Sequence, residues 1–201
     1  YAGELQDDPA LPPPEQEQAA VICRQGVRLR DLVSDLNLVS RLEYDMQPLE
    51  CQWLRPAKLV RRAVTDFMNA MPENPCGIEL EEVDESIRLQ GDERLLLRAL
   101  TNLLQNSVLH NPQGCAIRVS VRRDGADACL LSVRDDGVGA DPQKLASVLN
   151  APYAPKRAHG LGLFLVRRIT EISLIAFYHT AHRILYSVDF HIHSCDIVGT
   201  K

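Results

Sequence analysis

The chain has 201 residues, of which 45% are hydrophobic and 24% are charged, a composition typical of soluble globular domains. Its length suffices for one domain, or one and a half, with a core that needs no disulfide or metal ion to stabilise it. The 27 acidic and 22 basic side chains leave a net charge of −5, which argues against nucleic acid as a partner. The six cysteines include no CxxC pair, which favours reduced thiols and a cytosolic environment.

The amino-terminal part of the chain is predicted to be a proline-rich loop followed by a long helix. Four prolines lie within the first eighteen residues, and proline lacks the N–H that regular elements need. From residue 18 to about residue 45, Ile22, Leu29 and Leu36 recur at every seventh position and mark one apolar helical face. Such a stripe predicts packing against another helix, in the same chain or in a partner.

Helical and strand-like patterns alternate through the middle of the chain. Asp92 is a suitable N-cap for a long helix that ends before Asn111, and Asp124 with Gly125 is typical of a hairpin turn. The predicted helices cover residues 56–69, 92–110, a short segment after Asp141, and 159–172. The predicted strands cover residues 49–53, 78–83, 86–89, 117–121 and 129–133. After residue 170 the pattern changes, and only residues 184–192 alternate like a half-buried strand.

Three polar residues fall on one side of the helix predicted at residues 92–110. Asn102, Asn106 and His110 are four residues apart, and four residues correspond to about 400° of helical turn. An asparagine carbonyl is a neutral, hard oxygen of the kind that Mg²⁺ accepts when water and nucleotide phosphates fill the rest of its shell. The alternative is an ordinary amphipathic helix with amides on its solvent border, and the row taken alone favours that alternative.

A carboxylate and two glycines follow the strand predicted at residues 129–133. Gly137 and Gly139 allow the backbone to turn sharply and to approach a flat ligand closely. Asp135, at the end of the strand, could accept a hydrogen bond from an exocyclic amine such as that of adenine. Asp-Asp-Gly is also a common turn, and in isolation the turn is the better interpretation.

A third glycine motif, Gly160–Leu163, opens the helix predicted at residues 159–172. Glycines before a helix expose unpaired backbone amides at the positive end of the helix dipole, which suits phosphate oxygens. A phosphate could thus be bound without a strongly basic chain. The alternative is a glycine loop that only allows tight packing of helix on sheet.

In this order and at these intervals, the three motifs resemble the N, G1 and G2 boxes of the GHKL, or Bergerat, ATP-binding fold. This fold is shared by sensor histidine kinases, type II topoisomerases, mismatch-repair ATPases and heat-shock chaperones. Asn102 stands where the hydrolytic members have a glutamate base, and an amide cannot take a proton from water. The chain therefore most resembles the sensor histidine kinases, which implies phosphoryl transfer to a protein rather than ATP hydrolysis.

The resemblance implies an α+β fold, a two-layer α/β sandwich in which a mixed sheet packs on helices, with ATP and Mg²⁺ as ligands. Asn102 and His110 would be catalytic, Asn106 would bind Mg²⁺ and Asp135 would recognise adenine. The implied nucleotide-binding residues are Asn102, Asn106, His110, Asp135, Gly137, Gly139, Lys156, Arg157, Gly160, Leu161, Gly162 and Leu163.

Residues 22–44 resemble the second helix of the family's dimerisation and phosphoacceptor hairpin, and residues 1–5 resemble the end of its first helix. The resemblance implies a hairpin remnant at residues 1–48 and an ATP-binding domain at 49–201, of which 170–201 is an atypical tail. No histidine precedes His110, so we expect the acceptor histidine to be absent from this chain. The family's two closing strands have no recognisable counterpart after residue 169, which would leave one sheet edge open.

The implied partners are a second copy, bound through the helical hairpin, and the receiver domain of a response regulator, with no nucleic acid. The whole protein is expected to be a bacterial sensor anchored in the inner membrane, with this part in the cytoplasm. Two alternatives stay open. One is a non-catalytic nucleotide-binding scaffold for dimerisation or sensing, and the other is a serine kinase of the anti-sigma type. The stripe of Ile22, Leu29 and Leu36 argues against the serine kinase, which does not need a helical hairpin.

Overall fold

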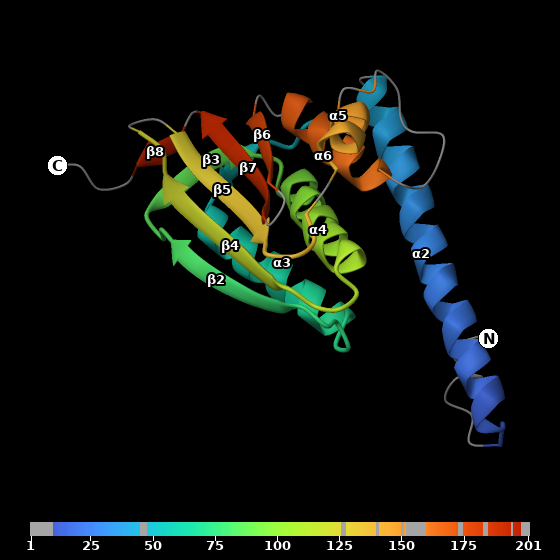
Figure 1. The fold of residues 1–201 in the computed structure, drawn as a ribbon. Coiled ribbons are helices and arrows are strands. Elements are labelled where there is room, and N and C mark those ends of the chain that lie inside the picture. Colours follow the sequence, from blue (N-terminus) through green and yellow to red (C-terminus); the bar gives the residue numbers. More distant parts are fainter. Residues whose placement is uncertain are drawn as a thin grey trace.

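The computed structural model describes residues 10–44, 48–125, 128–139, 141–149, 151, 160–172, 175–182, 185–193 and 195–197. They form an α+β fold with one long helix beside it, and the predicted fold class is confirmed (Figure 1). The helices are α2 (Pro13–Glu43), α3 (Pro56–Ala70), α4 (Glu93–His110), α5 (Pro142–Leu149) and α6 (Leu161–Ile172). The strands are β1 (Gln52–Leu54), β2 (Gly77–Val83), β3 (Ile87–Gly91), β4 (Ala116–Arg123), β5 (Ala128–Asp135), β6 (Ile175–His182), β7 (Leu185–His193) and β8 (Cys195–Ile197).

Helix α2 begins inside the segment that was predicted to be a loop, and that prediction is wrong for residues 13–17. Pro12 is the N-cap residue, and its carbonyl accepts hydrogen bonds from the backbone amides of Glu15 and Gln16. The following prolines occupy the first turn, where no residue needs an intrahelical N–H donor. Proline therefore starts this helix instead of preventing it.

The apolar stripe of α2 faces solvent in this single chain. Ile22 and Leu29 are each 63% exposed, and Leu36 is 52% exposed. The helix packs on the rest of the fold through another face near its carboxyl end, where Val39 and Leu42 are buried in the main hydrophobic core. The described residues thus leave the stripe without the helical cover that its spacing predicts. Within the described part of the chain, no helix has the combined length and apolar character of a membrane span.

Five strands form the main sheet in the order β2-β4-β5-β7-β6. Strand β2 runs parallel to β4, and the other neighbours are antiparallel, so the sheet is mixed as predicted. Figure 1 shows helices α3 and α4 on one face of this sheet. Strand β4 turns Ile117, Val119 and Val121 toward the buried side, because alternate residues of a strand point to one face. A smaller sheet joins β1, β3 and β8.

Helix α4 is the central helix of the helical layer. Its predicted cap is confirmed, because Asp92 Oδ1 accepts hydrogen bonds from the backbone N–H groups of Arg94 and Leu95 at 3.0 and 3.3 Å. Leu96, Leu100 and Leu103 are buried on one face of the helix. This burial fixes the rotation of α4, and with it the direction of the polar row that begins at Asn102.

The tail supplies strands that the sequence analysis did not identify, which corrects the expectation of an open edge beside β5. Strand β7 overlaps the one predicted tail strand, and it pairs with β5 from Ala128↔His193 to Asp135↔Tyr186. Strand β6 then pairs with β7 along its whole length. The edges of the main sheet are therefore β2 and β6.

Candidate functional site

Asp135 is a buried carboxylate at the end of β5, only 3% exposed. Its Oδ2 accepts a hydrogen bond from the Ser107 hydroxyl of α4 at 2.8 Å. Its Oδ1 accepts from Asn111 Nδ2 and from the backbone N–H of Gly137, each at 3.2 Å. These contacts fix the carboxylate between the end of α4 and the glycine turn, as expected for a group that recognises a ligand in one orientation.

Asn111 connects the elements around Asp135, although the sequence pattern predicted for it only the end of a helix. Its Nδ2 also donates to the carbonyl of Ser107 at 2.8 Å, while its Oδ1 accepts from the backbone N–H of Val138 at 2.9 Å. One side-chain amide thus ties the last turn of α4 to Asp135 and to the glycine turn. A lone asparagine after a helix carries no sequence signal for such a role.

Gly137 is required by the close approach of Asn111. A Cβ atom at residue 137 would lie 1.9 Å from Asn111 Oδ1, well inside the contact distance of two atoms. We expect Gly137→Ala to displace the Asn111 amide and to weaken the binding of an ATP analogue, as measured by calorimetric titration. The matched control is Gly77→Ala, because a Cβ at residue 77 meets nothing within 4 Å. Equal affinity in both variants would contradict this role for the turn.

The polar row on α4 runs from a buried to an exposed position. Asn102 is 5% exposed, Asn106 is half-buried and His110 is exposed. Gly162 of α6 lies beside Asn102, since a Cβ atom at residue 162 would be 3.7 Å from Asn102 Cγ. The row therefore starts at the amino-terminal end of α6 and leads toward the corner that holds Asp135.

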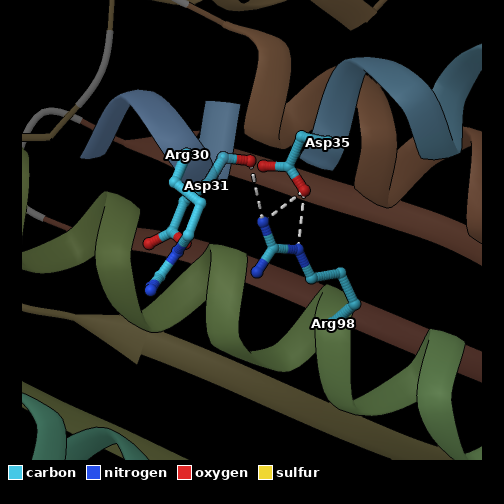
Figure 2. Close-up of polar contacts among 4 residues, drawn as sticks. All are labelled: Arg30, Asp31, Asp35 and Arg98. Carbon is cyan, nitrogen blue, oxygen red and sulfur yellow. Dashed lines mark hydrogen bonds and ion pairs between the residues drawn. The ribbon is translucent and has the colours of Figure 1, made fainter. Parts of the chain in front are cut away.

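Asn102 is also close to α2. Its Nδ2 is buried and makes no hydrogen bond of standard geometry with the described residues, yet the side chain is near enough to Asp35 to favour its ionised form. Figure 2 shows Arg98 reaching from α4 toward Asp31 and Asp35 of α2. Arg98 contacts Asp35 Oδ1 through Nε at 2.6 Å and through Nη2 at 2.5 Å, and Nη2 donates to the Asp31 carbonyl at 3.3 Å. This cluster links the amino-terminal helix directly to the start of the polar row.

Asp35 carries the titratable group of this cluster and is 6% exposed. Burial raises the pKa of its carboxyl above the ordinary value of 3.8, and the guanidinium of Arg98 opposes that rise. Desolvation has the larger effect on this pKa. The ionised form of the buried Asp35 carboxyl therefore depends on the guanidinium of Arg98 for its stabilisation.

The third motif forms the start of α6. Gly160 has φ +89°, a left-handed conformation that favours glycine, and its carbonyl accepts the first helical hydrogen bond, from Phe164 N at 2.9 Å. The backbone amides of residues 161–163 therefore belong to the first turn, whose N–H groups have no partner within a helix. Leu161 and Leu163 are buried, and Gly162 is half-buried against Asn102. Lys156 and Arg157, which were predicted to reach the phosphates, lie outside the described residues.

The three motifs lie one after another along helix α4. The start of α6 lies at the level of Asn102, while Asp135 is bonded at the level of Ser107, five residues further along the helix. Five residues of α-helix span about 7.5 Å. Asn106 lies between these two levels, and Gly139, with φ +72°, lies in the turn beyond Asp135. The arrangement offers a carboxylate at one end and helix-start amides at the other, which suits a ligand with a base and phosphates.

Comparison with known proteins gives the class of this site. Residues 91–184 match the family model described as histidine kinase-, DNA gyrase B- and HSP90-like ATPase, a segment that holds all three motifs. Residues 91–184 are therefore an ATP-binding domain of this family, and the chain is similar to sensor histidine kinases.

Particular relatives support this assignment. The sensor histidine kinase TrcS of Mycobacterium tuberculosis is 32% identical over 176 residues, which are 83% of this chain and 34% of TrcS. The structure of the Acinetobacter baumannii histidine kinase AdeS has a TM-score of 0.72 at 17% identity, and the match covers 96% of this chain and 90% of that one. A structure of histidine kinase ThkA with the response regulator protein TrrA has a TM-score of 0.70 at 20% identity, covering 94% and 53%. The chain spans about a third or less of the length of the curated relatives it matches first.

Proposed function

We propose that this chain is the catalytic, ATP-binding part of a sensor histidine kinase, and that it transfers the γ-phosphate of ATP to a histidine outside the chain. The observation that carries the proposal is the buried Asp135 carboxylate, held by α4 and the glycine turn in the same row as the start of α6. The match of residues 91–184 to an ATPase family that includes histidine kinases supports it.

Asp135 is proposed to recognise the adenine amine. A carboxylate has about four acceptor positions, and three described donors, from Ser107, Asn111 and Gly137, use three of them. The remaining acceptor position, on a carboxylate already fixed in orientation, suits one donor from a ligand. The close turn at Gly137 and Gly139 would pass beside the base.

Asn106 is proposed to bind Mg²⁺, and its half-buried amide on the row between the two ends of the site fits a single neutral oxygen ligand. When bound, the ion neutralises charge on the phosphates during transfer. The backbone amides that start α6 would bind phosphate oxygens, and His110 would border the base from the exposed end of the row. Lys156 and Arg157 keep their predicted role as phosphate contacts.

Asn102 is proposed to act by position and not as a base. Its buried Nδ2 lies near Asp35 of α2 and makes no hydrogen bond of standard geometry with the described residues. An amide accepts no proton from water at neutral pH, so nothing at this position would activate water. The site would then retain ATP for an acceptor side chain instead of hydrolysing it.

Replacement of Asn106 by alanine tests the metal role. We expect wild-type protein to bind a non-hydrolysable ATP analogue more tightly with Mg²⁺ than without it, and Asn106→Ala to lose most of that difference. Calorimetric titration in the presence and absence of Mg²⁺ measures this. Gln105→Ala, on the same helical turn, is the matched control and should keep the Mg²⁺ effect. A full Mg²⁺ effect in Asn106→Ala would refute the role of Asn106.

A transfer assay separates the kinase from the non-catalytic scaffold. The chain is mixed with a separate helical hairpin that bears an acceptor histidine, and with ATP labelled at the γ-phosphate. Label on the hairpin histidine supports the kinase. Analogue binding without any transfer supports the scaffold, and label on serine supports the anti-sigma type of kinase.

The proposed setting is that of a longer sensor protein. Residues 1–48 would belong to the dimerisation and phosphoacceptor hairpin, and residues 49–201 would be the ATP-binding domain, including the tail at 170–201. The exposed stripe of α2 supports dimerisation through the hairpin, since a second helix would cover it. The partner after transfer would be a response regulator receiver domain, and the ThkA structure, which is similar to this chain, contains a response regulator protein. We also infer a cytoplasmic position below an inner-membrane anchor.

A further inference from the structure

Two cysteines lie side by side where β2 and β4 begin. Cys76 directly precedes β2 and Cys115 directly precedes β4, and their neighbours Gly77 and Ala116 are paired in the parallel register. The backbone N–H of Gly77 donates to the carbonyl of Cys115 at 2.9 Å, and the two Sγ atoms are 3.1 Å apart. Cys76 is buried and Cys115 is half-buried. Both are free thiols.

The local backbone suits a covalent bond between these thiols. Neighbouring strands lie about 4.8 Å apart, and disulfides usually join Cα atoms separated by about 4.4–6.8 Å. The segments before the two strands are already in tight contact, because a Cβ atom at Gly114 would lie 2.7 Å from the Pro75 carbonyl oxygen. Closing the bond, at about 2.05 Å, requires the sulfur atoms to move by about 1 Å and leaves the strand pairing in place.

The cysteine pair is in contact with the residues that hold Asp135 and the glycine turn in place. Cys76 Sγ donates to the backbone carbonyl of Asn111 at 3.8 Å, and the Asn111 side chain is the one that ties Asp135 to the glycine turn. On the other side, Ala116 N donates to Asp136 Oδ1 at 2.7 Å and the Ala116 carbonyl accepts from Asp136 N at 3.2 Å. Both cysteines are therefore one contact away from residues that position the turn.

We propose that Cys76 and Cys115 form a reversible intrachain disulfide under oxidation by a peroxide, and that this bond lowers nucleotide affinity. In the first step one thiol reduces hydrogen peroxide to water and becomes a sulfenic acid. In the second step the other thiol attacks that sulfur, the S–S bond forms and a second water leaves. Overall, two thiols and one peroxide give one disulfide and two waters.

The effect on nucleotide binding rests on the proposed function. The disulfide removes the S–H that Cys76 donates to the Asn111 carbonyl, and it shifts the two sulfur atoms by about 1 Å at the start of β2 and β4. Both changes loosen the support of Asp135 and Gly137. We expect affinity for an ATP analogue to fall about threefold to tenfold, the loss associated with one hydrogen bond.

The reaction should be slow near neutral pH. Burial raises the pKa of the Cys115 thiol to about 12, and Cys76, Asp135 and Asp136 add to the rise. The thiolate is the reactive form, and its fraction at Cys115 falls about tenfold for each pH unit below that pKa. The pair would therefore remain reduced during brief exposure and close under sustained oxidation.

The test uses the full chain, oxidised with hydrogen peroxide at pH 8.5 and then digested without reductant. Mass spectrometry should find a peptide pair linked through Cys76 and Cys115, lost after dithiothreitol treatment and absent from Cys115→Ser. Cys51→Ser, which removes an exposed thiol elsewhere, is the matched control and should retain the linkage. Linkage found only at other cysteines, or only higher oxides at Cys76 and Cys115, would overturn the proposal.

Analogue affinity is then measured on the reduced and the oxidised chain. A loss that dithiothreitol reverses, and that Cys115→Ser does not show, supports redox control of the site. Linkage with unchanged affinity overturns that control. If the reduced chain binds no analogue, the proposed function fails, while the peptide mapping still decides whether the disulfide forms.

Discussion

Asp135→Asn should weaken the binding of a non-hydrolysable ATP analogue about ten- to a hundredfold, which corresponds to about 1–3 kcal/mol for one unpaired buried polar group. The asparagine oxygen can still accept from Asn111 and Gly137, and the Ser107 hydroxyl can rotate to accept from the new amide. The fold should persist, but the position that accepted the adenine amine becomes a donor. Calorimetric titration measures the loss of affinity.

Two further variants make this result specific. Asp136→Asn is the matched control, because Asp136 is the next residue, is exposed, and accepts from Ala116 N through an oxygen that asparagine also has. It should bind the analogue normally. Asp135→Ala should in addition destabilise the fold, because Ser107, Asn111 and Gly137 each lose a hydrogen bond to the carboxylate. Normal affinity in a folded Asp135→Asn protein would refute the adenine contact.

Arg98→Ala should destabilise the packing of α2 on α4 by about 2–3 kcal/mol at pH 7. Removing one partner of a fully buried ion pair costs about 3–5 kcal/mol. The Arg98 side chain is 24% exposed, so we expect a smaller destabilisation here. The loss leaves the Asp35 carboxylate buried without its guanidinium (Figure 2). Urea unfolding followed by circular dichroism, together with limited proteolysis of α2, measures the change.

The pH dependence of this effect has a definite sign. Burial raises the pKa of Asp35 in the folded protein, so protonated Asp35 stabilises the folded state at low pH, and that contribution is lost as the pH rises through the folded pKa. Arg98→Ala removes a cation that lowers the pKa of Asp35. The destabilisation that this substitution causes should therefore become smaller as acid protonates the Asp35 carboxylate. Arg61→Ala is the matched control, since Arg61 pairs with Glu85 at 2.8 Å with both side chains more than half exposed. Arg61→Ala should lower the free energy of unfolding by about 0–1 kcal/mol, both at pH 7 and in acid. An Arg98 effect that does not decrease in acid would contradict this account.

Local sequence signals predicted most elements of the fold. The Asp92 cap, the spacing of Leu96, Leu100 and Leu103, and the alternation in β4 act within a few residues, and the structure has the same elements within a few positions. The prolines before α2 were misinterpreted because proline is excluded from helix interiors but fits a first turn. Strands β6 and β8 were missed because their pairing depends on β7 and β3, which lie elsewhere in the sequence.

The candidate site was predicted in part. Asp135, the row from Asn102 to His110 and the glycines are visible as motifs, because each combines a residue type with a fixed spacing. The role of Asn111 was not visible, since it depends on three groups that tertiary packing brings together. The same holds for Asp35, which is buried because α2 packs against α6 and Arg98 of α4 reaches its carboxylate, contacts that no local pattern specifies.

Strand β2 is one edge of the main sheet, and its charge bears on contacts between copies of this chain at high concentration. Its free backbone groups could bind a strand from another molecule, yet Glu79, Glu81 and Glu82 are all exposed along it. Of these three glutamates, Glu81 has a described ion pair, with Arg118 at 3.2 Å. Two such edges brought together would place glutamates against glutamates, so electrostatic repulsion opposes the growth of continuous sheets through this edge.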